Sequence, residues 1–235
     1  MRSYDVDLSE ATGEKPEDYP SFNAFFTRAL QTGARPIDSD SDVVVSPADG
    51  TMSQCGSIES GTLLQAKGNH YKIHDLAGAL GDGFDRGHFA TVYLAPDNYH
   101  RVHLPIAGRL THTLAQPGAL FSVNQHTAAA IKDLFVRNER LVCRFETILG
   151  PVLVILVGAI IVASIETVWG SPFSPYRRVE LNEHHLDFEK GAELGRFLLG
   201  STVICCFPQD TITLDPNLAP ETPVKMGQSI GVIKT

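Results

Sequence analysis

Residues 147–165 read TILGPVLVILVGAIIVASI, a run of 19 uncharged residues that lies between two glutamates. The run is long enough on paper for a membrane span, which takes about 20 residues. Valine and isoleucine dominate it, however, glycine and proline interrupt it, and no basic flanks or aromatic belt frame it. Residues 152–157 and 159–165 are therefore predicted to form two strands that are buried on both faces, with the membrane span as the alternative.

On both sides of this run, short apolar segments alternate with glycine and proline, which is typical of strands joined by turns. Strands are predicted at residues 43–45, 62–65, 89–94, 108–114, 141–147, 196–199 and 202–207, and a turn followed by a strand at 222–233. Helices are predicted at residues 73–80 and 126–135. A further short helix is predicted after Ser21, a favoured N-cap residue, with an apolar stripe that extends to Leu30 before Gly33 and Pro36 end the helix. Together these elements predict one α+β domain over residues 1–235, a β-rich sandwich or partly closed barrel with a few short helices.

Composition limits the classes of function. The net charge of −8 argues against a nucleic-acid-binding protein, which needs a basic surface to neutralise phosphates, and against docking on an anionic membrane through net charge alone. Four cysteines without a CxxC pair predict reduced thiols rather than a disulfide scaffold or a thiolate zinc site. The first residues lack the apolar segment of a signal peptide, which predicts an intracellular chain.

Three places in the sequence carry side chains suited to catalysis. His100 and His103 lie between prolines and lack a third ligand nearby, so they suit acid–base chemistry or a structural role, and no metal site is predicted. Ser201 follows Gly200, whose missing side chain leaves the preceding carbonyl open to attack, although the same pair fits a strand bulge. Asp49 precedes a glycine in a predicted turn, which is an ordinary turn pair.

These residues leave two interpretations open. An aspartate, a histidine and a serine can assemble as orienter, base and nucleophile, so a serine hydrolase built from Asp49, His103 and Ser201 is one of them, although the GxSxG elbow is absent. A carrier domain is the other, because the VKMGQ segment at 224–228 is similar to the hairpin of biotinyl and lipoyl domains. Such domains are much shorter than this chain.

Taken in order along the chain, a series of short motifs resembles the phosphatidylserine decarboxylase family over about residues 22–204. One such motif is weak evidence, whereas their joint occurrence in the family's order is highly specific. The motifs are Phe25-Phe26-Thr27-Arg28, Arg35-Pro36-Ile37, Ser46-Pro47-Ala48-Asp49-Gly50, Leu64-Gln65-Ala66-Lys67-Gly68, Tyr99-His100-Arg101-Val102-His103-Leu104-Pro105, Gly118-Ala119-Leu120-Phe121-Ser122-Val123-Asn124, Arg137-Asn138-Glu139-Arg140, Val157-Gly158-Ala159, Ser164-Ile165-Glu166-Thr167-Val168, Lys190-Gly191 and Leu199-Gly200-Ser201-Thr202.

The resemblance implies an enzyme that cleaves its own chain between Gly200 and Ser201. The serine hydroxyl attacks the glycine carbonyl, with His103 as base and Asp49 as its orienter. Residues 1–200 then form the β chain and residues 201–235 the α chain, whose first residue has become a pyruvoyl group. That cofactor, derived from Ser201, decarboxylates phosphatidylserine to phosphatidylethanolamine and CO₂, and His100 assists decarboxylation and the return of a proton.

The resemblance also implies partners and a location. The expected partners are phosphatidylserine, a membrane surface, the two cleaved chains for one another, and a second copy in a homodimer, but no nucleic acid. We expect a peripheral protein on the cytoplasmic face of the cell membrane, because the polar start of the chain offers no N-terminal anchor. The helix with Phe22, Phe25 and Phe26 is expected to dock on the body of the protein or to touch the bilayer. A decarboxylase of another seryl lipid is the alternative within the same class.

Overall fold

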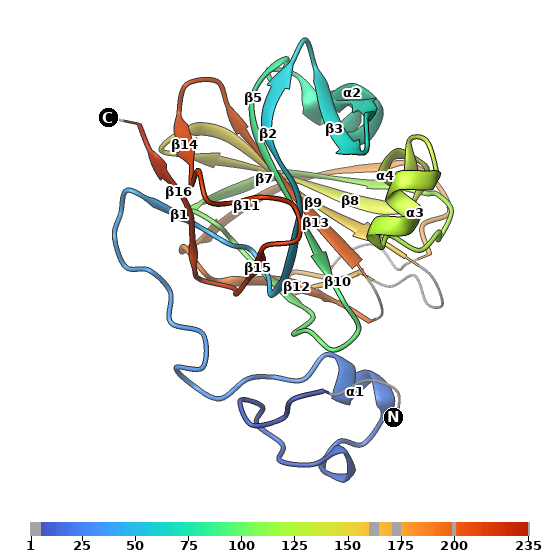
Figure 1. The fold of residues 1–235 in the computed structure, drawn as a ribbon, viewed down its shortest axis with the longest axis vertical. Helices are drawn as coiled ribbons and strands as arrows, with labels where there is room; N and C mark the ends of the chain where they lie inside the picture. Colours follow the sequence, from blue (N-terminus) through green and yellow to red (C-terminus); the bar gives the residue numbers. More distant parts are fainter. Residues whose placement is uncertain (1–5, 160–164, 171–174, 199–200, 235) are drawn as a thin grey trace.

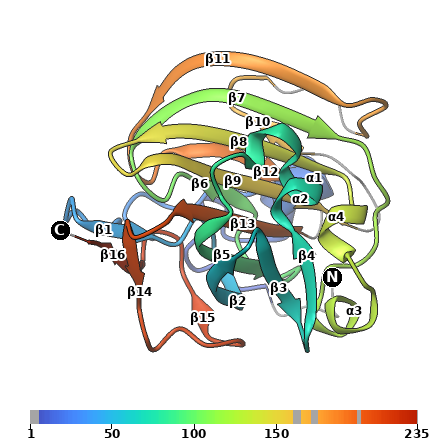
Figure 2. The same ribbon diagram turned by 90° about the horizontal axis from the view of Figure 1, so that it is seen from above.

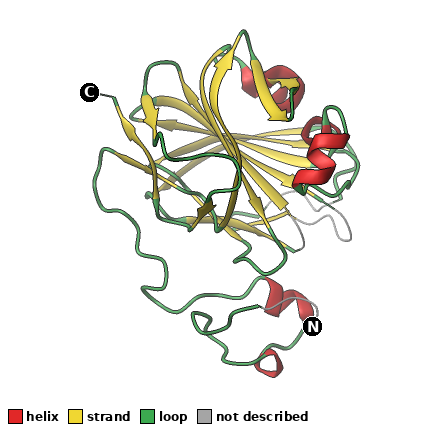
Figure 3. Ribbon diagram, in the orientation of Figure 1, coloured by secondary structure: helices red, strands yellow, loops and turns green. Residues whose placement is uncertain are grey.

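The computed structural model describes residues 6–159, 165–170, 175–198 and 201–234, and its dominant feature is one ten-stranded sheet (Figures 1 and 3). The order of nine strands along this sheet is β11 (Glu180–Phe188), β7 (Gly108–Gln116), β8 (Arg140–Thr147), β9 (Gly150–Gly158), β13 (Ser201–Pro208), β5 (Arg86–Leu94), β2 (Gly50–Glu59), β3 (Thr62–Ala66) and β4 (Asn69–Lys72). The tenth strand, β15 (Pro223–Val224), pairs with β2. All of these pairings are antiparallel.

Two three-stranded sheets and a few short helices cover the large sheet. One small sheet contains β1 (Val43–Val45), β16 (Ser229–Ile233) and β14 (Ile212–Leu214), and the other contains β10 (Ile165–Thr167), β12 (Glu193–Phe197) and β6 (Arg101–His103). The helices are α1 (Phe22–Phe26), α2 (Ile73–Ala77), α3 (Gln125–Ala130) and α4 (Leu134–Arg137), with 3₁₀ turns η1 (Pro16–Asp18) and η2 (Gly78–Gly81). Helices α2, α3 and α4 lie on the side of the large sheet opposite β1, β14 and β16 (Figures 1 and 2).

Strand β9 is buried on both faces, as its sequence predicts. Val152, Val154 and Leu156 belong to the core shared with the two small sheets, while the intervening residues belong to the core under the helices. Successive side chains of a strand point to opposite faces, so a strand between two such cores must be apolar at every position. The six residues from Val152 to Val157 have no exposed surface. None of the helices in the described part of the chain is long and apolar enough to cross a membrane.

The predicted fold class is confirmed. The structure is β-rich α+β with a few short helices; it is layered as a sandwich, and no sheet formed by the described residues closes into a barrel. The second strand expected in the uncharged run falls mostly on residues 160–164, which lie outside the described residues, and β10 begins at Ile165. The single helix predicted at 126–135 is wrong, because Ile131 ends α3 in an extended conformation and Asp133 is left-handed, with φ of 56°.

The prediction missed β11. Its sequence, ELNEHHLDF, is polar on both faces because the strand lies at the edge of the large sheet and pairs only with β7. An edge strand does not need the apolar alternation that marks a half-buried strand, and charged residues there oppose aggregation. The pattern therefore carried no strand signal.

The segment before β1 holds α1 against the body of the protein. Ser21 caps this helix as predicted, since its side chain accepts a hydrogen bond from the Ala24 N–H. Phe25 and Phe26 are buried, whereas Phe22 is 51% exposed. The apolar stripe thus docks on the protein through two rings and leaves the third at the surface.

We expect Ile155→Ala to destabilise the protein by about 2–5 kcal/mol, because it opens a cavity in a strand packed on both faces. Thermal unfolding followed by circular dichroism measures the change. The matched control is Ile148→Ala in the β8–β9 turn, where the side chain is 85% exposed, and its expected change is within about 0.5 kcal/mol. Equal shifts for the two variants would contradict the doubly buried position of β9.

Candidate active site

Ser201 is the first residue of β13, in the middle of the large sheet. It pairs with Leu94 of β5 on one side and with Gly158 of β9 on the other. Its side chain lies on the same face as Val203, the face that the small sheets cover. The hydroxyl is buried and has no hydrogen-bond partner among the described residues. Such a group is rare in a folded protein and calls for an explanation, such as a catalytic role. Gly200, the other residue of the expected cleavage site, lies outside the described residues.

His100 lies in the loop that follows β5, so Ser201 and this loop meet at the same end of the sheet. The Phe197 N–H, four residues before the serine, donates to the His100 carbonyl at 3.0 Å. His100 Nδ1 lies 2.9 Å from the Asn98 carbonyl, so Nδ1 carries the proton and donates it. Nε2 is therefore left with a lone pair, and it is buried without a partner. Burial lowers the pKa of His100 to about 4, so the imidazole is neutral at pH 7.

His103, at the end of β6, is held at both ring nitrogens. Nδ1 donates to the Gly191 carbonyl at 2.8 Å, and Nε2 accepts from the Tyr99 hydroxyl at 3.1 Å. Burial lowers the pKa of His103 below its ordinary value and raises that of Tyr99 to about 12. The phenol therefore stays protonated and remains the donor to a neutral imidazole.

The carboxylate of Asp49 is paired with an arginine and not with a histidine. Arg35 donates from Nε and Nη2 to its carboxylate, and the Met226 N–H donates to Oδ1 at 2.9 Å. The hydrogen bonds that Arg35 donates to Asp49 raise the pKa of Arg35 above its ordinary value. No hydrogen bond among the described residues joins Asp49 to His103, although the His103 N–H donates to the carbonyl of Pro47, two residues away. Asp49 acts on the imidazole through its charge, which favours the protonated form.

Helix α1 and the residues after it cover this loop. The Phe26 ring centroid lies 3.9 Å from that of His100, Arg101 Nε donates to the Thr27 carbonyl, and Arg28 Nη2 donates to the Asp97 carbonyl at 2.9 Å. The sequence motifs around Phe25 and around His100 therefore meet in space.

The sequence analysis gave no role to Arg28, Arg35 or Tyr99. Each of the three residues belongs to a quoted motif. For the two arginines, nothing nearby in the sequence indicates a role, because the contacts described above join each of them to residues at least 14 positions away. An arginine that ends up buried looks the same in sequence as one on the surface. Tyr99 reaches His103 from only four residues away, and this spacing was the one signal that was available.

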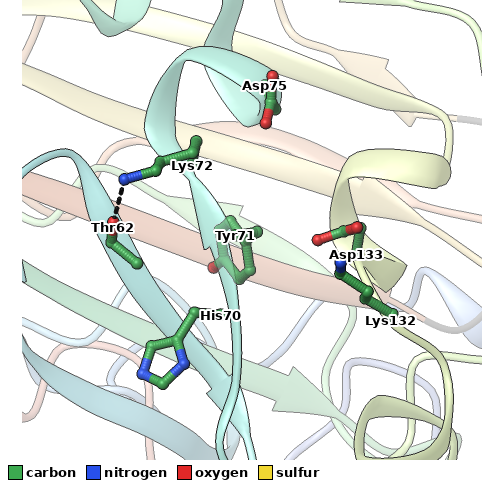
Figure 4. A pocket seen from close by; sticks show the side chains of 7 residues that line it. All are labelled: Thr62, His70, Tyr71, Lys72, Asp75, Lys132 and Asp133. Atoms are coloured by element: carbon green, nitrogen blue, oxygen red, sulfur yellow. Dashed lines mark hydrogen bonds between the residues drawn. The ribbon is translucent and has the colours of Figure 1, made fainter.

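An open pocket of about 570 Å³ lies elsewhere, between β3, β4 and the start of α4 (Figure 4). Lys72 donates to Thr62 across it, and Asp75, Lys132 and Asp133 bring charges of both signs to its wall. None of the predicted site residues lines this pocket. Its mixed and partly paired charges define no ligand, so the site chemistry belongs to the region around His100 and Ser201.

The site defines a class of protein: an enzyme whose β-rich α+β scaffold encloses a serine and two neutral imidazoles. A sequence model of the family described as Phosphatidylserine decarboxylase matches residues 22–232. The chain is 50% identical to the phosphatidylserine decarboxylase proenzyme of Azotobacter vinelandii, with 98% of this chain and 84% of that protein covered. It is 52% identical to the proenzyme of the same name from Acinetobacter baumannii strain AYE, with 97% and 81% covered. The chain therefore belongs to the phosphatidylserine decarboxylase family, which confirms the resemblance seen in its motifs.

We expect His100 to make the protein less stable in acid. The unfolded chain protonates this imidazole near pH 6.5, whereas the folded protein holds it neutral to about pH 4. The unfolded state therefore binds the proton first, and stability that is intact above pH 6.5 is lost as the pH falls through this window. The loss attributable to this residue is about 3 kcal/mol.

Melting temperatures at several pH values measure this contribution as the difference between the unchanged protein and His100→Gln. The variant should lose less stability between pH 6.5 and 4. His74→Gln is the matched control, because the His74 side chain is half exposed. Parallel pH profiles for the unchanged protein and His100→Gln would contradict a buried, neutral His100.

Proposed function

We propose that this chain is a self-processing, pyruvoyl-dependent decarboxylase that converts phosphatidylserine to phosphatidylethanolamine and CO₂. The observation that carries the proposal is the buried Ser201 hydroxyl without a hydrogen-bond partner, at the position of the cleavage motif. Membership in the family supports the reaction, and the relatives' name of proenzyme supports processing. A serine hydrolase that leaves its chain intact is not favoured by the family.

In the proposed cleavage, Ser201 Oγ attacks the carbonyl carbon of Gly200, and the peptide C–N bond gives way to an ester. His103 takes the hydroxyl proton and returns it to the released amine. Its neutral state supports this role, because a base must be unprotonated to act. Elimination of the ester leaves dehydroalanine at residue 201, and its hydrolysis releases ammonia and gives the pyruvoyl group. Residues 1–200 and 201–235 become two chains.

The pyruvoyl group supplies a carbonyl that takes up the substrate's amine and the electron pair left by the departing CO₂. His100 handles the proton. Its Nε2 lone pair takes a proton from the substrate's ammonium group, which must be neutral to react, and later delivers that proton to the carbon that has lost CO₂. The hydrogen bond from Nδ1 to Asn98 supports this role, because it fixes Nε2 as the acceptor.

The same proposal includes a peripheral location on the cytoplasmic face of the cell membrane. Phe22, exposed on the helix that covers His100, is the residue best placed to touch the bilayer from which the substrate comes. A homodimer, which the resemblance implies, is also part of the proposal. Binding to phosphatidylserine vesicles tests the membrane location, and the molar mass from light scattering tests the homodimer. Decarboxylation of a second seryl lipid tests the choice of substrate.

The intact mass of the purified protein should show two chains. The fragment 201–235 is expected to be about 17 Da lighter than a peptide that begins with serine, because its amine leaves as ammonia. Ser201→Ala should remain one chain of 25.5 kDa. Ser229→Ala, in the same fragment, is the matched control and should cleave normally. A single unprocessed chain in the unchanged protein would contradict the proposal.

The two histidines should separate cleavage from turnover. His103→Ala is expected to stay uncleaved, because the base that accepts the serine proton is gone. His100→Ala should still cleave but lose decarboxylation of phosphatidylserine by about 10²–10⁴-fold, the usual effect of losing an acid–base group. Mass spectrometry and release of labelled CO₂ measure the two steps, with the half-exposed His74→Ala as control. A cleaved His100→Ala protein with normal turnover would rule out this division.

A further inference from the structure

Arg28, two residues after α1, is a buried cation with donors left over. The residue is only 4% exposed, and its guanidinium makes hydrogen bonds only through Nη2, to the carbonyls of Asp97 and Asn98. Nε and Nη1 are buried and have no hydrogen-bond partner in the part of the chain that the structure describes. Burying a charged donor without a partner is strongly unfavourable. A ligand that accepts those hydrogen bonds would remove this penalty.

Arg140 shows how this fold treats an arginine with a purely structural role. It is 3% exposed, and its guanidinium donates to the carbonyls of Leu76, Asp75 and Val136, as well as to that of Asn138. All three of its nitrogens are engaged. The two arginines are equally buried, so burial alone does not account for the unused donors of Arg28.

The unused donors lie at the candidate active site. The charge of Arg28 is close enough to His100 to lower the pKa of that imidazole, and Asn98 O accepts hydrogen bonds from both side chains. Other arginines of this region are already neutralised, since Arg35 is paired with Asp49 and Arg101 with Glu193. Arg28 forms no such ion pair with any described residue. It is the cation that remains available to a ligand.

We propose that Arg28 binds the phosphodiester of the lipid headgroup whose amine reacts beside His100. The buried guanidinium charge and its free Nε and Nη1 donors suit the oxygens of a phosphate, because hydrogen bonds between charged groups are stronger than those between neutral groups. The inference rests on the proposed function, because it takes the anionic seryl lipid as the substrate. A protein of net charge −8 needs a local cation to hold such a lipid.

The phosphodiester fits this position better than the substrate's carboxylate does. The carboxylate loses its charge when CO₂ leaves, so an arginine bound to it would stabilise the starting state more than the transition state and would slow the reaction. The phosphodiester keeps its charge throughout. Binding it anchors the headgroup equally well before and after the reaction, and leaves the carboxylate in the apolar surroundings that favour its loss.

Helix α1 packs against both residues. Its Phe25 ring lies 5.7 Å from the Arg28 guanidinium, and its Phe26 ring lies against His100. In the proposal the headgroup enters beside α1, whose remaining ring, Phe22, is exposed. The same short helix covers the anion site and the proton-transfer site.

Binding of glycerophosphocholine to the purified protein tests the proposal, because this compound has the phosphodiester but no primary amine that could react with a carbonyl. Titration followed by ³¹P NMR line broadening gives its dissociation constant. Arg28→Gln should raise that constant at least about tenfold, which corresponds to about 1.4 kcal/mol. Arg109→Gln is the matched control, since Arg109 pairs with Asp187 in an exposed position on the edge strands. It should bind as the unchanged protein does.

Several results would overturn the proposal. Choline lacks the phosphodiester. If the unchanged protein binds choline as tightly as it binds glycerophosphocholine, the proposal is wrong. Binding of inorganic phosphate as tightly would assign Arg28 to phosphate in general and not to the diester. If circular dichroism shows that Arg28→Gln is unfolded, Arg28→Lys takes its place, because lysine keeps the positive charge but lacks the planar guanidinium. Arg28→Lys should weaken binding of glycerophosphocholine severalfold. Unchanged binding would contradict the proposal.

The intact mass of the same samples separates this test from that of the proposed function. An unprocessed chain contradicts self-cleavage, whereas glycerophosphocholine still reports on Arg28 because it does not react with the pyruvoyl group. If the protein is cleaved into two chains and Arg28→Gln binds glycerophosphocholine as tightly as the unchanged protein does, the proposed function stands and the anion site is rejected.

Discussion

The burial of β9 and β13 on both faces is the constraint on which the rest of the structure depends. Every side chain from Val152 to Val157 needs an apolar neighbour, so the large sheet must be covered by helices on one side and by small sheets on the other. The antiparallel register of these strands then places Ser201 opposite Gly158, inside the protein. A serine so enclosed is screened from water, which is the environment that the proposed attack on a neighbouring carbonyl requires.

The same enclosure sets the charges at the site. Burial keeps His100 and His103 neutral at pH 7. Nε2 of His100 is free of any described partner, whereas Nε2 of His103 accepts from the Tyr99 hydroxyl. The carboxylate of Asp49 can stay buried only because Arg35 and a backbone N–H accompany it. An aspartate so occupied influences His103 through its field and not through a shared hydrogen bond. The imidazole of His103 is oriented instead by its hydrogen bonds with the Gly191 carbonyl and the Tyr99 hydroxyl.

Sequence patterns predicted the parts of the fold whose cause is local or periodic. The apolar run of β9, the Ser21 cap and the strands at β7 and β8 each rest on a handful of neighbouring residues, and all of them appear as expected. Edge strand β11 and the break before Asp133 were missed, because an edge tolerates polar residues and a left-handed residue leaves little trace in composition. At the site, the residue types suited to the chemistry were visible, and the motifs identified the family. Arg35 and Gly191, the partners of Asp49 and His103, were not visible, since these contacts depend on how distant loops pack.

Unsatisfied polar groups say more about this site than a cavity does. Among the described residues, buried side-chain atoms without a hydrogen-bond partner also occur on Thr167 and Tyr176, whereas the guanidinium of Arg140 is fully paired. The site is distinguished because the hydroxyl of Ser201, Nε2 of His100 and two nitrogens of Arg28 are among these atoms and come from three segments that are far apart in the sequence. Under the proposed function, their partners are a peptide carbonyl, a substrate ammonium and a phosphodiester. The stability forgone at these atoms is the physical cost of keeping them ready for those partners, which is why the strongest clue to function is a set of hydrogen bonds that the folded chain does not make.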